Sequence, residues 1–139
     1  MTTWLALDIG DKRIGLAAGN DAARLARPLR VLTRRSKNED FEAIARAMQD
    51  VGADELLAGL PLNMDGSEGP QAKSARKYAE RLRRRLDVPL RFQDERLTSF
   101  VADQILSRRA TQKARRQPND AIAAAAILQS FLDQLPPQE

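Results

Sequence analysis

The spacing of apolar residues limits the folds open to this chain more than any other feature. Apolar residues alternate with their neighbours over 4–9, and a glycine-bearing turn signal at 10–12 leads into a second strand-like run over 13–18. A period of two is typical of β-strands, and a turn between two such runs predicts a hairpin. With a further strand expected over 29–33, three strands open the chain.

The pattern then changes to helical spacing, in which apolar residues recur from Phe41 to Val51. Ser36 and Asn38 are candidate N-cap residues, because their side-chain oxygens can accept a free backbone N–H. Gly52 can end the helix in a left-handed conformation. The first helix is therefore expected between these signals.

Strands and helices are expected to alternate from there on. Short apolar runs predict strands over 55–60 and 89–93. Between them, a polar loop over 62–69 precedes helical spacing over 70–86. Thr98 is a candidate cap for a further helix.

The last helix is expected to have Pro118 in its first turn and to end before Pro136. The segment 109–117, which precedes it, is polar, basic and aperiodic, which favours a loop. The helix is apolar nearly all round, so much of it should be buried. Its large apolar residues are Ile122, Ile127, Leu128, Phe131 and Leu132.

The predicted order β-β-β-α-β-α-β-α-α indicates an α/β fold. A leading meander followed by alternating helices and strands favours a mixed five-stranded sheet with helices on both faces. The 139 residues suit a single domain over 1–139. No signal-peptide pattern is evident, and the longest apolar run, over 121–128, is far shorter than the roughly 20 residues that span a bilayer. A soluble, cytoplasmic protein is expected.

The absence of two residue types narrows the chemistry. The chain has no cysteine and no histidine. A disulfide framework, thiolate metal sites and imidazole metal sites are therefore excluded, as are Ser-His-Asp and Cys-His catalytic machinery. Hydrolysis by this chain would have to use carboxylates, lysines or a metal ion held by carboxylates.

Positive charge is concentrated in two segments, although the net charge is only +4. Basic clusters of this kind are typical of proteins that bind a polyanion. A solvated helix face and an exposed loop would give the same pattern. The two clusters are Lys73, Arg76, Lys77, Arg81, Arg83, Arg84 and Arg85, and Arg108, Arg109, Lys113, Arg115 and Arg116.

Three acidic residues are candidate catalytic groups, because each ends an element that should enter the sheet core. Asp8 lies in an apolar strand, Glu95 follows the fifth strand, and Asp120 lies in the first turn of the last helix. A lone carboxylate is costly to bury unless it is paired or bound to a metal. Each also has a structural explanation: a partner for Lys12 or Arg13, a common loop triplet, and a favourable helix-dipole position.

Oxygen ligands without histidine or cysteine suit Mg²⁺ or Mn²⁺. Two such ions about 4 Å apart can clamp an in-line phosphodiester displacement and activate a water molecule. Phosphate-loop alternatives are not supported, because neither a G-x-G-x-x-G nor a G-K-[ST] motif is present. An actin-like ATPase would need a second domain.

Four motifs resemble the YqgF (RuvX) family, whose members are described as candidate nucleases for pre-16S rRNA and as Holliday-junction-resolvase-like proteins. The motifs keep the family's order and spacing, and the resemblance covers nearly the whole chain. They are LALDIGDKRIGLA at 5–17, GLPLNMDGSEG at 59–69, DERLTS at 94–99 and NDAIAAAAIL at 119–128. The resemblance implies an RNase H-like fold.

The resemblance also implies roles for individual residues. Asp8, Glu95 and Asp120 would be the catalytic metal ligands. Other residues would contact phosphates or lie in a loop beside the cleft: Lys12, Arg13, Arg96, Asn63, Asp65 and Ser67. The chain departs from the family pattern at Asn119, where a β-branched residue is usual, and the last helix offers no further acid before Asp133.

Three functions follow as expectations. The first is a nuclease, using Mg²⁺ or Mn²⁺, that acts on structured RNA in the maturation of ribosomal RNA precursors. The second keeps the site but cleaves branched DNA, which requires a two-fold homodimer. The third is a non-catalytic RNA-binding or ribosome-assembly factor. In each case Lys113, Arg115 and Arg116 are expected to form a substrate clamp.

Overall fold

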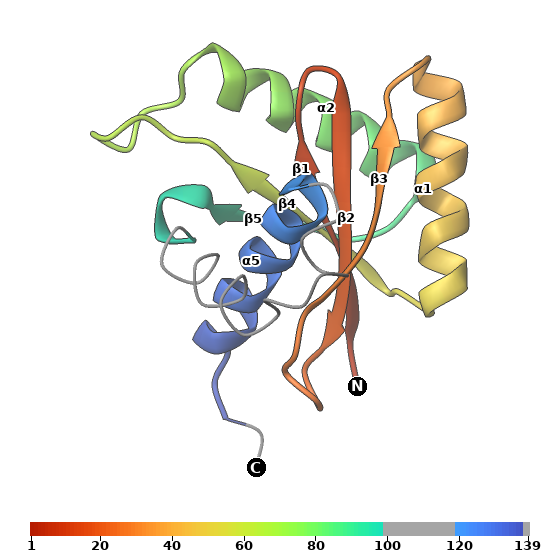
Figure 1. The fold of residues 1–139 in the computed structure, drawn as a ribbon, viewed down its shortest axis with the longest axis vertical. Coiled ribbons are helices and arrows are strands. Elements are labelled where there is room, and N and C mark those ends of the chain that lie inside the picture. Colours follow the sequence, from red (N-terminus) through yellow and green to blue (C-terminus); the bar gives the residue numbers. More distant parts are fainter. Residues whose placement is uncertain (99–118, 138–139) are drawn as a thin grey trace.

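The architecture was analysed in a computed structural model, which describes residues 1–98 and 119–137 (Figure 1). Strands and helices alternate along the chain in the predicted order over these residues. The elements are β1 (Thr3–Ile9), β2 (Arg13–Asn20), β3 (Arg27–Thr33), α1 (Lys37–Val51), β4 (Glu55–Leu60), α2 (Pro70–Leu86), β5 (Leu90–Asp94), the 3₁₀ turn η1 (Glu95–Leu97) and α5 (Asn119–Gln134).

The five strands form one mixed sheet in the order β3-β2-β1-β4-β5. β1, β2 and β3 are antiparallel neighbours, whereas β4 lies parallel to β1 and β5 lies parallel to β4. The carboxyl ends of β1, β4 and β5 therefore meet at the same edge of the sheet. This arrangement confirms the predicted mixed five-stranded sheet.

Helices cover both faces of the sheet, as predicted (Figure 1). Successive residues of β1 point to opposite faces. Trp4 and Ala6 belong to a core formed with α5, and Leu5 and Leu7 belong to a core formed with α1 and α2. Burying a large aliphatic side chain of this kind contributes roughly 1.5–3 kcal/mol to the hydrophobic stabilisation of the fold.

The ends of α1 follow from local signals in the sequence. The Ser36 side chain accepts a hydrogen bond from the backbone N–H of Glu39 at 3.2 Å, so Ser36 rather than Asn38 is the N-cap. Gly52 has a φ of 67°, and its N–H donates to carbonyls of the last turn. This left-handed conformation is one that glycine adopts without a steric penalty.

Strand ends differ from the prediction where pairing with a neighbour decides them. β2 extends to Asn20 because it continues to pair with β1, through Trp4–Gly19 and Thr3–Asn20. β3 begins at Arg27 because its ladder with β2 continues through Ala17–Pro28 and Ala18–Arg27. An irregular register between Leu16 and Ala17 accompanies the proline, which an edge strand tolerates. β5 is displaced by one residue from the prediction, at 90–94.

The last helix is buried, as its apolar sequence predicts. Ala124, Leu128 and Leu132 of α5 are fully buried against the sheet. The predicted helix after Thr98, the predicted loop over 109–117 and Pro118 lie outside the described residues. Within the described part of the chain, no helix is long and apolar enough to cross a membrane.

Candidate active site

Asp8 and Glu95 line one pocket of about 200 Å³ at the edge of the sheet where the parallel strands end. Asp8 is the penultimate residue of β1, and Glu95 is the first residue after β5. Their carboxyl groups share a hydrogen bond, although the two residues lie far apart in the sequence. The fold therefore brings together two of the three predicted catalytic acids.

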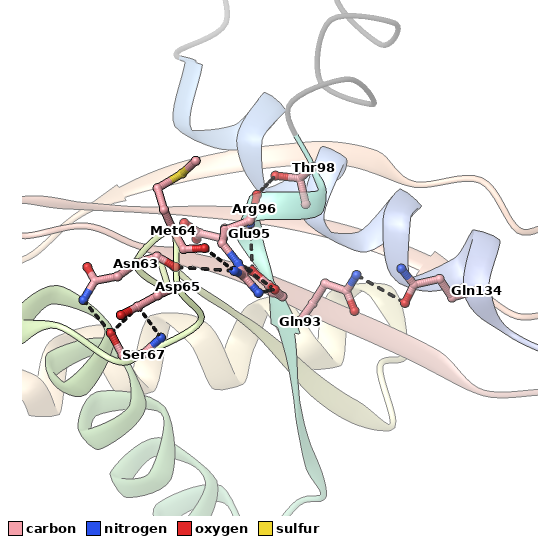
Figure 2. A network of polar contacts seen from close by, with 10 residues as sticks. Asn63, Met64, Asp65, Ser67, Gln93, Glu95, Arg96, Thr98 and Gln134 are labelled. Atoms are coloured by element: carbon pink, nitrogen blue, oxygen red, sulfur yellow. Dashed lines mark hydrogen bonds and ion pairs between the residues drawn. The ribbon is translucent and has the colours of Figure 1, made fainter.

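Hydrogen bonds on both sides fix the backbone of Glu95. The Asp94 carboxylate accepts from the backbone N–H of Arg96 at 2.9 Å, which starts the turn η1. The carbonyl of Glu95 accepts from the backbone N–H of Thr98 at 3.1 Å and from its hydroxyl at 2.7 Å (Figure 2). The carboxyl group thus extends from a rigid turn rather than from an open loop.

Gly59 makes room for this carboxyl group, a role that was not predicted. A Cβ atom at this position of β4 would lie 2.5 Å from Oε1 of Glu95 and 2.6 Å from Cδ1 of Ile127. Real Cβ atoms do not approach other atoms so closely, so only glycine fits without movement. A glycine inside a predicted strand was the available signal, because it often marks a close approach of another group.

Partial burial and the neighbouring acid change the titration of Glu95. Removal from water, the charge of Asp8 and the hydrogen bond with Asp8 raise the pKa of Glu95 to about 8. Two like charges so close together cannot both persist without a counterion, so the metal-free pair shares a proton near neutral pH. A divalent cation would reverse this preference by stabilising both carboxylates.

The helix that carries the third predicted acid begins toward the same edge of the sheet. Asp120 lies in the first turn of α5, whose N-terminal end points toward the end of the sheet where β1 finishes (Figure 1). The side chain of Asp120 lies outside the described part of the structure. Among the described side chains, no group of three acids is placed to hold one metal ion. Asp120 therefore stays a predicted ligand.

Arg96 connects the turn that carries Glu95 to the loop over 61–69 (Figure 2). Its guanidinium forms an ion pair with Asp94, at 2.7 Å from Nη2 to Oδ2, and also donates to the carbonyl of Met64 at 3.0 Å. The hydrogen bonds from Arg96 hold the pKa of Asp94 below its usual range. Its predicted phosphate contact would have to use the same guanidinium.

The loop over 61–69 is organised by its own polar side chains. Asn63 donates from Nδ2 to the Ser67 hydroxyl at 3.0 Å, and the Ser67 N–H donates to Asp65 at 2.9 Å. The hydrogen bond that the Ser67 hydroxyl donates to Asp65 at 2.6 Å, together with the one from the Ser67 N–H and the positive charge of Arg96, lowers the pKa of Asp65. The three residues are exposed, and the loop begins at Pro61, which lines the pocket. Their predicted place beside the cleft and a substrate contact by Asn63 stay predictions.

Lys12 and Arg13 lie at the β1–β2 hairpin and do not line the pocket. Among the described residues, the cation in the pocket lining is Arg34, which follows β3 and was not among the predicted site residues. Its Nη1 donates to the carbonyl of Gly10 at 2.8 Å. No local pattern marks this arginine, because its place depends on contacts across 24 residues.

The predicted clamp residues Lys113, Arg115 and Arg116 lie outside the described residues, so their contact with a substrate stays a prediction. The described lining of the pocket comes from the end of β1, from α2 and from the segments after β3, β4 and β5. Besides the two acids it consists of Ile9, Gly10, Asp11, Arg34, Pro61, Gln71, Ser74 and Ala75.

Comparison with curated proteins finds relatives along nearly the whole chain. A protein of Anaeromyxobacter sp. (strain K), named "Putative pre-16S rRNA nuclease", is 45% identical over 134 residues, covering 96% of this chain and 98% of its own. A protein of the same name from Moorella thermoacetica is 39% identical over 132 residues, covering 94% of each chain.

Solved structures with the same fold include two resolvases. T. thermophilus RuvC in complex with a Holliday junction substrate has a TM-score of 0.65 at 12% identity, covering 94% of this chain and 92% of that chain. The fowlpox virus Holliday junction resolvase has a TM-score of 0.60 at 11% identity, covering 96% and 100%. At these identities the likeness shows the fold alone, which is the RuvC-like RNase H fold.

A family model described as RuvX, Holliday junction resolvase, matches residues 2–134. The four sequence motifs, the RNase H-like sheet and the extent of the similarity to the Anaeromyxobacter and Moorella proteins all agree with this match. The chain belongs to the RuvX (YqgF) family of nucleases.

Proposed function

We propose that this protein is a nuclease that uses Mg²⁺ or Mn²⁺ to hydrolyse phosphodiester bonds in structured RNA. Its proposed role is the 5′-end maturation of 16S rRNA precursors. The observation that carries the proposal is the contact between the carboxyl groups of Asp8 and Glu95 in a pocket at the carboxyl ends of parallel strands. The names of the curated relatives support the choice of RNA.

The donor set of the pocket fits a hard divalent cation. Two carboxyl groups that repel each other when ionised gain most from a shared positive charge. Asp8 and Glu95 would hold the cation, with Asp120 as the third proposed ligand and two ions as the expected number. When bound, the cation supplies an activated water molecule and a positive charge beside the scissile phosphate.

The protein's own groups would prepare the site for this chemistry. The strand at Asp8 and the turn at Glu95 hold the two carboxyl groups on rigid elements, which keeps their separation fixed. The shared proton has to leave before both groups can act as anionic ligands. Arg34 supplies a cation at the pocket wall that can bind a phosphate oxygen.

Cleavage of an RNA carrying the precursor 5′ end of 16S rRNA tests the proposal. The variants Asp8→Asn and Glu95→Gln should each lower the cleavage rate at least about 100-fold, since each removes a proposed metal ligand. Asp50→Asn, which changes an exposed acid that pairs with Arg30, is the matched control and should cleave as the wild type does. Equal cleavage by all four proteins would overturn the proposal.

Branched DNA is the second candidate substrate. The observation that favours it is the fold shared with two Holliday junction resolvases, T. thermophilus RuvC and the fowlpox virus enzyme. Symmetric nicking of a four-way junction needs two active sites, and hence a two-fold dimer. The same variants should be assayed on a labelled junction while sedimentation measures the oligomeric state. A monomer that leaves the junction uncut would remove this candidate.

A non-catalytic RNA-binding role is the remaining alternative. Calorimetric titration with Mn²⁺ separates it from the nucleases, since the proposed site requires binding that Asp8→Asn and Glu95→Gln abolish. Phosphate contacts alone would give strong salt dependence without metal dependence.

The predicted clamp residues give a further test. The double variant Arg115→Gln, Arg116→Gln should weaken RNA binding and flatten its salt dependence.

A further inference from the structure

A second pocket of about 200 Å³ lies next to the acidic pocket and is lined by positive charge. It is formed where the segment after β3 and the first turn of α1 face the side of α2. Its described lining contains no acidic residue. The lining residues are Arg34, Lys37, Ser74, Lys77, Tyr78 and Arg81.

The two pockets share part of their walls. Arg34 and Ser74 line both of them, so the basic pocket continues from the pocket that holds Asp8 and Glu95. A nucleic-acid chain that runs out of the acidic pocket past Arg34 would therefore meet three further cations, Lys37, Lys77 and Arg81.

The charge of the basic pocket is not neutralised within the described structure. Across residues 1–98 and 119–137, no ion pair involves Arg34, Lys37, Lys77 or Arg81. Other cations of α2 do have acidic partners, as in the pairs Arg76–Glu68 and Arg83–Glu80. Lys77 and Arg81 are four residues apart on α2, so they lie on the same side of the helix.

Arg34 is held in place before any ligand arrives. Its guanidinium donates to the carbonyl of Gly10 at 2.8 Å and lies 4.6 Å from the ring centre of Tyr78. The Tyr78 hydroxyl in turn donates to the buried carboxylate of Asp40 at 3.4 Å. Asp40 does not line the pocket. An arginine fixed in this way loses little freedom when it binds an anion.

We propose that this basic pocket binds a phosphate of the substrate backbone other than the one that is cleaved. The inference rests on the proposed nuclease function and extends it, since it gives the substrate chain a direction across the protein, from the acidic pocket toward α1 and α2. The pocket offers the ammonium groups of Lys37 and Lys77 and the guanidinium group of Arg81. Arg34 adds a guanidinium group that is already held in place. Four cations around a small pocket match the charge of a phosphodiester and its neighbours.

The double variant Lys77→Gln, Arg81→Gln tests the proposal. Binding of a labelled stem-loop RNA and of a labelled four-way DNA junction would be measured over a range of salt concentrations, in Ca²⁺ or EDTA so that no cleavage occurs. The control is Arg27→Gln, Arg46→Gln, which removes the same charge from exposed residues that line neither pocket. Circular dichroism would check that both double variants fold.

The pocket variant should bind about tenfold more weakly than the control. The slope of log affinity against log salt should become shallower by about 0.7 to 0.9 for each phosphate that the variant no longer binds. In cleavage assays the pocket variant should raise KM and leave kcat within about twofold, because it removes binding that the substrate and the transition state use equally. Whichever nucleic acid binds more weakly to the variant is the substrate whose backbone the pocket holds.

The proposal is overturned if the pocket variant and the control bind both nucleic acids with the same affinity and the same salt slope. This outcome differs from failure of the proposed function. A wild-type protein that cuts neither nucleic acid, with weaker binding only in the pocket variant, would refute the nuclease and keep the phosphate pocket. A wild-type protein that cuts RNA, with unchanged binding in the pocket variant, would support the nuclease and refute the phosphate pocket.

Discussion

The carboxyl group of Glu95 carries a proton near neutral pH because it is partly buried and touches a second acid, Asp8. Its pKa of about 8 lies well above the ordinary value of 4.5. At pH values between these two pKa values, the folded protein therefore keeps a proton on Glu95 that the unfolded chain releases. Two carboxyl groups in contact would favour a bound cation and do not favour the stability of the metal-free protein, as is common at functional sites.

This raised pKa predicts how the stability of the metal-free protein depends on pH. A proton held more tightly by the folded state stabilises it fully at low pH, and this stabilisation is lost as pH rises toward 8. Between pH 5.5 and 8.5, the free energy of unfolding in EDTA should thus fall more for the wild type than for Glu95→Gln. Urea unfolding at several pH values measures this difference. Parallel pH profiles of the unfolding free energy for the two proteins would contradict the prediction.

Gly59 provides a second prediction at this scale. The variant Gly59→Ala places a methyl group against Glu95 and Ile127, and overpacking of this kind costs roughly 1–3 kcal/mol of unfolding free energy. The double variant Gly59→Ala, Ile127→Val removes the Cδ1 atom from the contact. Compared with Gly59→Ala, this double variant should recover part of the lost free energy of unfolding. It should not recover affinity for the metal, because the added methyl group still contacts Glu95. Recovery of both stability and metal affinity would show that the added methyl group does not displace Glu95.

The turn η1 and the strand before it show how elements position the site. Gln93, in β5, donates from Nε2 to the hydroxyl of Ser130 in α5 at 3.2 Å, and both side chains are buried. Arg96 joins η1 to the loop over 61–69 through the carbonyl of Met64 (Figure 2). Glu95 thus lies between two connections, one to the helix that covers the sheet and one to the loop beside the pocket.

The variant Arg96→Gln should loosen the loop over 61–69 without unfolding the domain. Exposed ion pairs contribute no more than about 1 kcal/mol, so global stability should change little. Backbone amide exchange should become faster at Asn63 and Gly66, whose N–H groups bond within the loop. The control Arg91→Gln removes another exposed ion pair, with Glu55. Unchanged amide exchange in Arg96→Gln would show that the hydrogen bonds within the loop are enough to keep its conformation.

The element pattern was largely predictable because the signals for strands and helices are local. β4 and α2 have the predicted bounds, and the Ser36 and Gly52 signals mark the ends of α1. The ends of β2 and β3 were predicted two residues short. Their last pairs depend on a neighbouring strand rather than on hydrophobic alternation.

The candidate site was predictable only in its acids. Asp8 and Glu95 stand out as acids at the ends of apolar strands, and the fold brings them together. Gly59 and Arg34 owe their importance to partners far away in the sequence, at Glu95 and at Gly10, and no local period reveals such contacts. Lys12 and Arg13 were selected for their charge and the family motif, and neither lines the pocket.

At the scale of the whole molecule, a metal ion that binds the acids would change the free energy of unfolding. A cation that binds only the folded protein stabilises it by about 2.7 kcal/mol at 100 times its dissociation constant. Adding Mn²⁺ should therefore raise the unfolding midpoint of the wild type, and chelation should reverse the change. The effect should vanish in Asp8→Asn and persist in Asp50→Asn. A shift of equal size in both variants would indicate binding elsewhere.

The outermost strand β3 has a consequence for how copies of this protein can associate. Sheets extend by pairing unoccupied strand edges, and natural edges discourage this with proline and exposed charge. β3 carries both: Pro28 has no amide hydrogen to donate, and Arg27 and Arg30 are exposed beside it. A continuous ten-stranded dimer across this edge is thus disfavoured, and a two-fold pair able to cut both strands of a junction would have to meet through a surface other than the β3 edge.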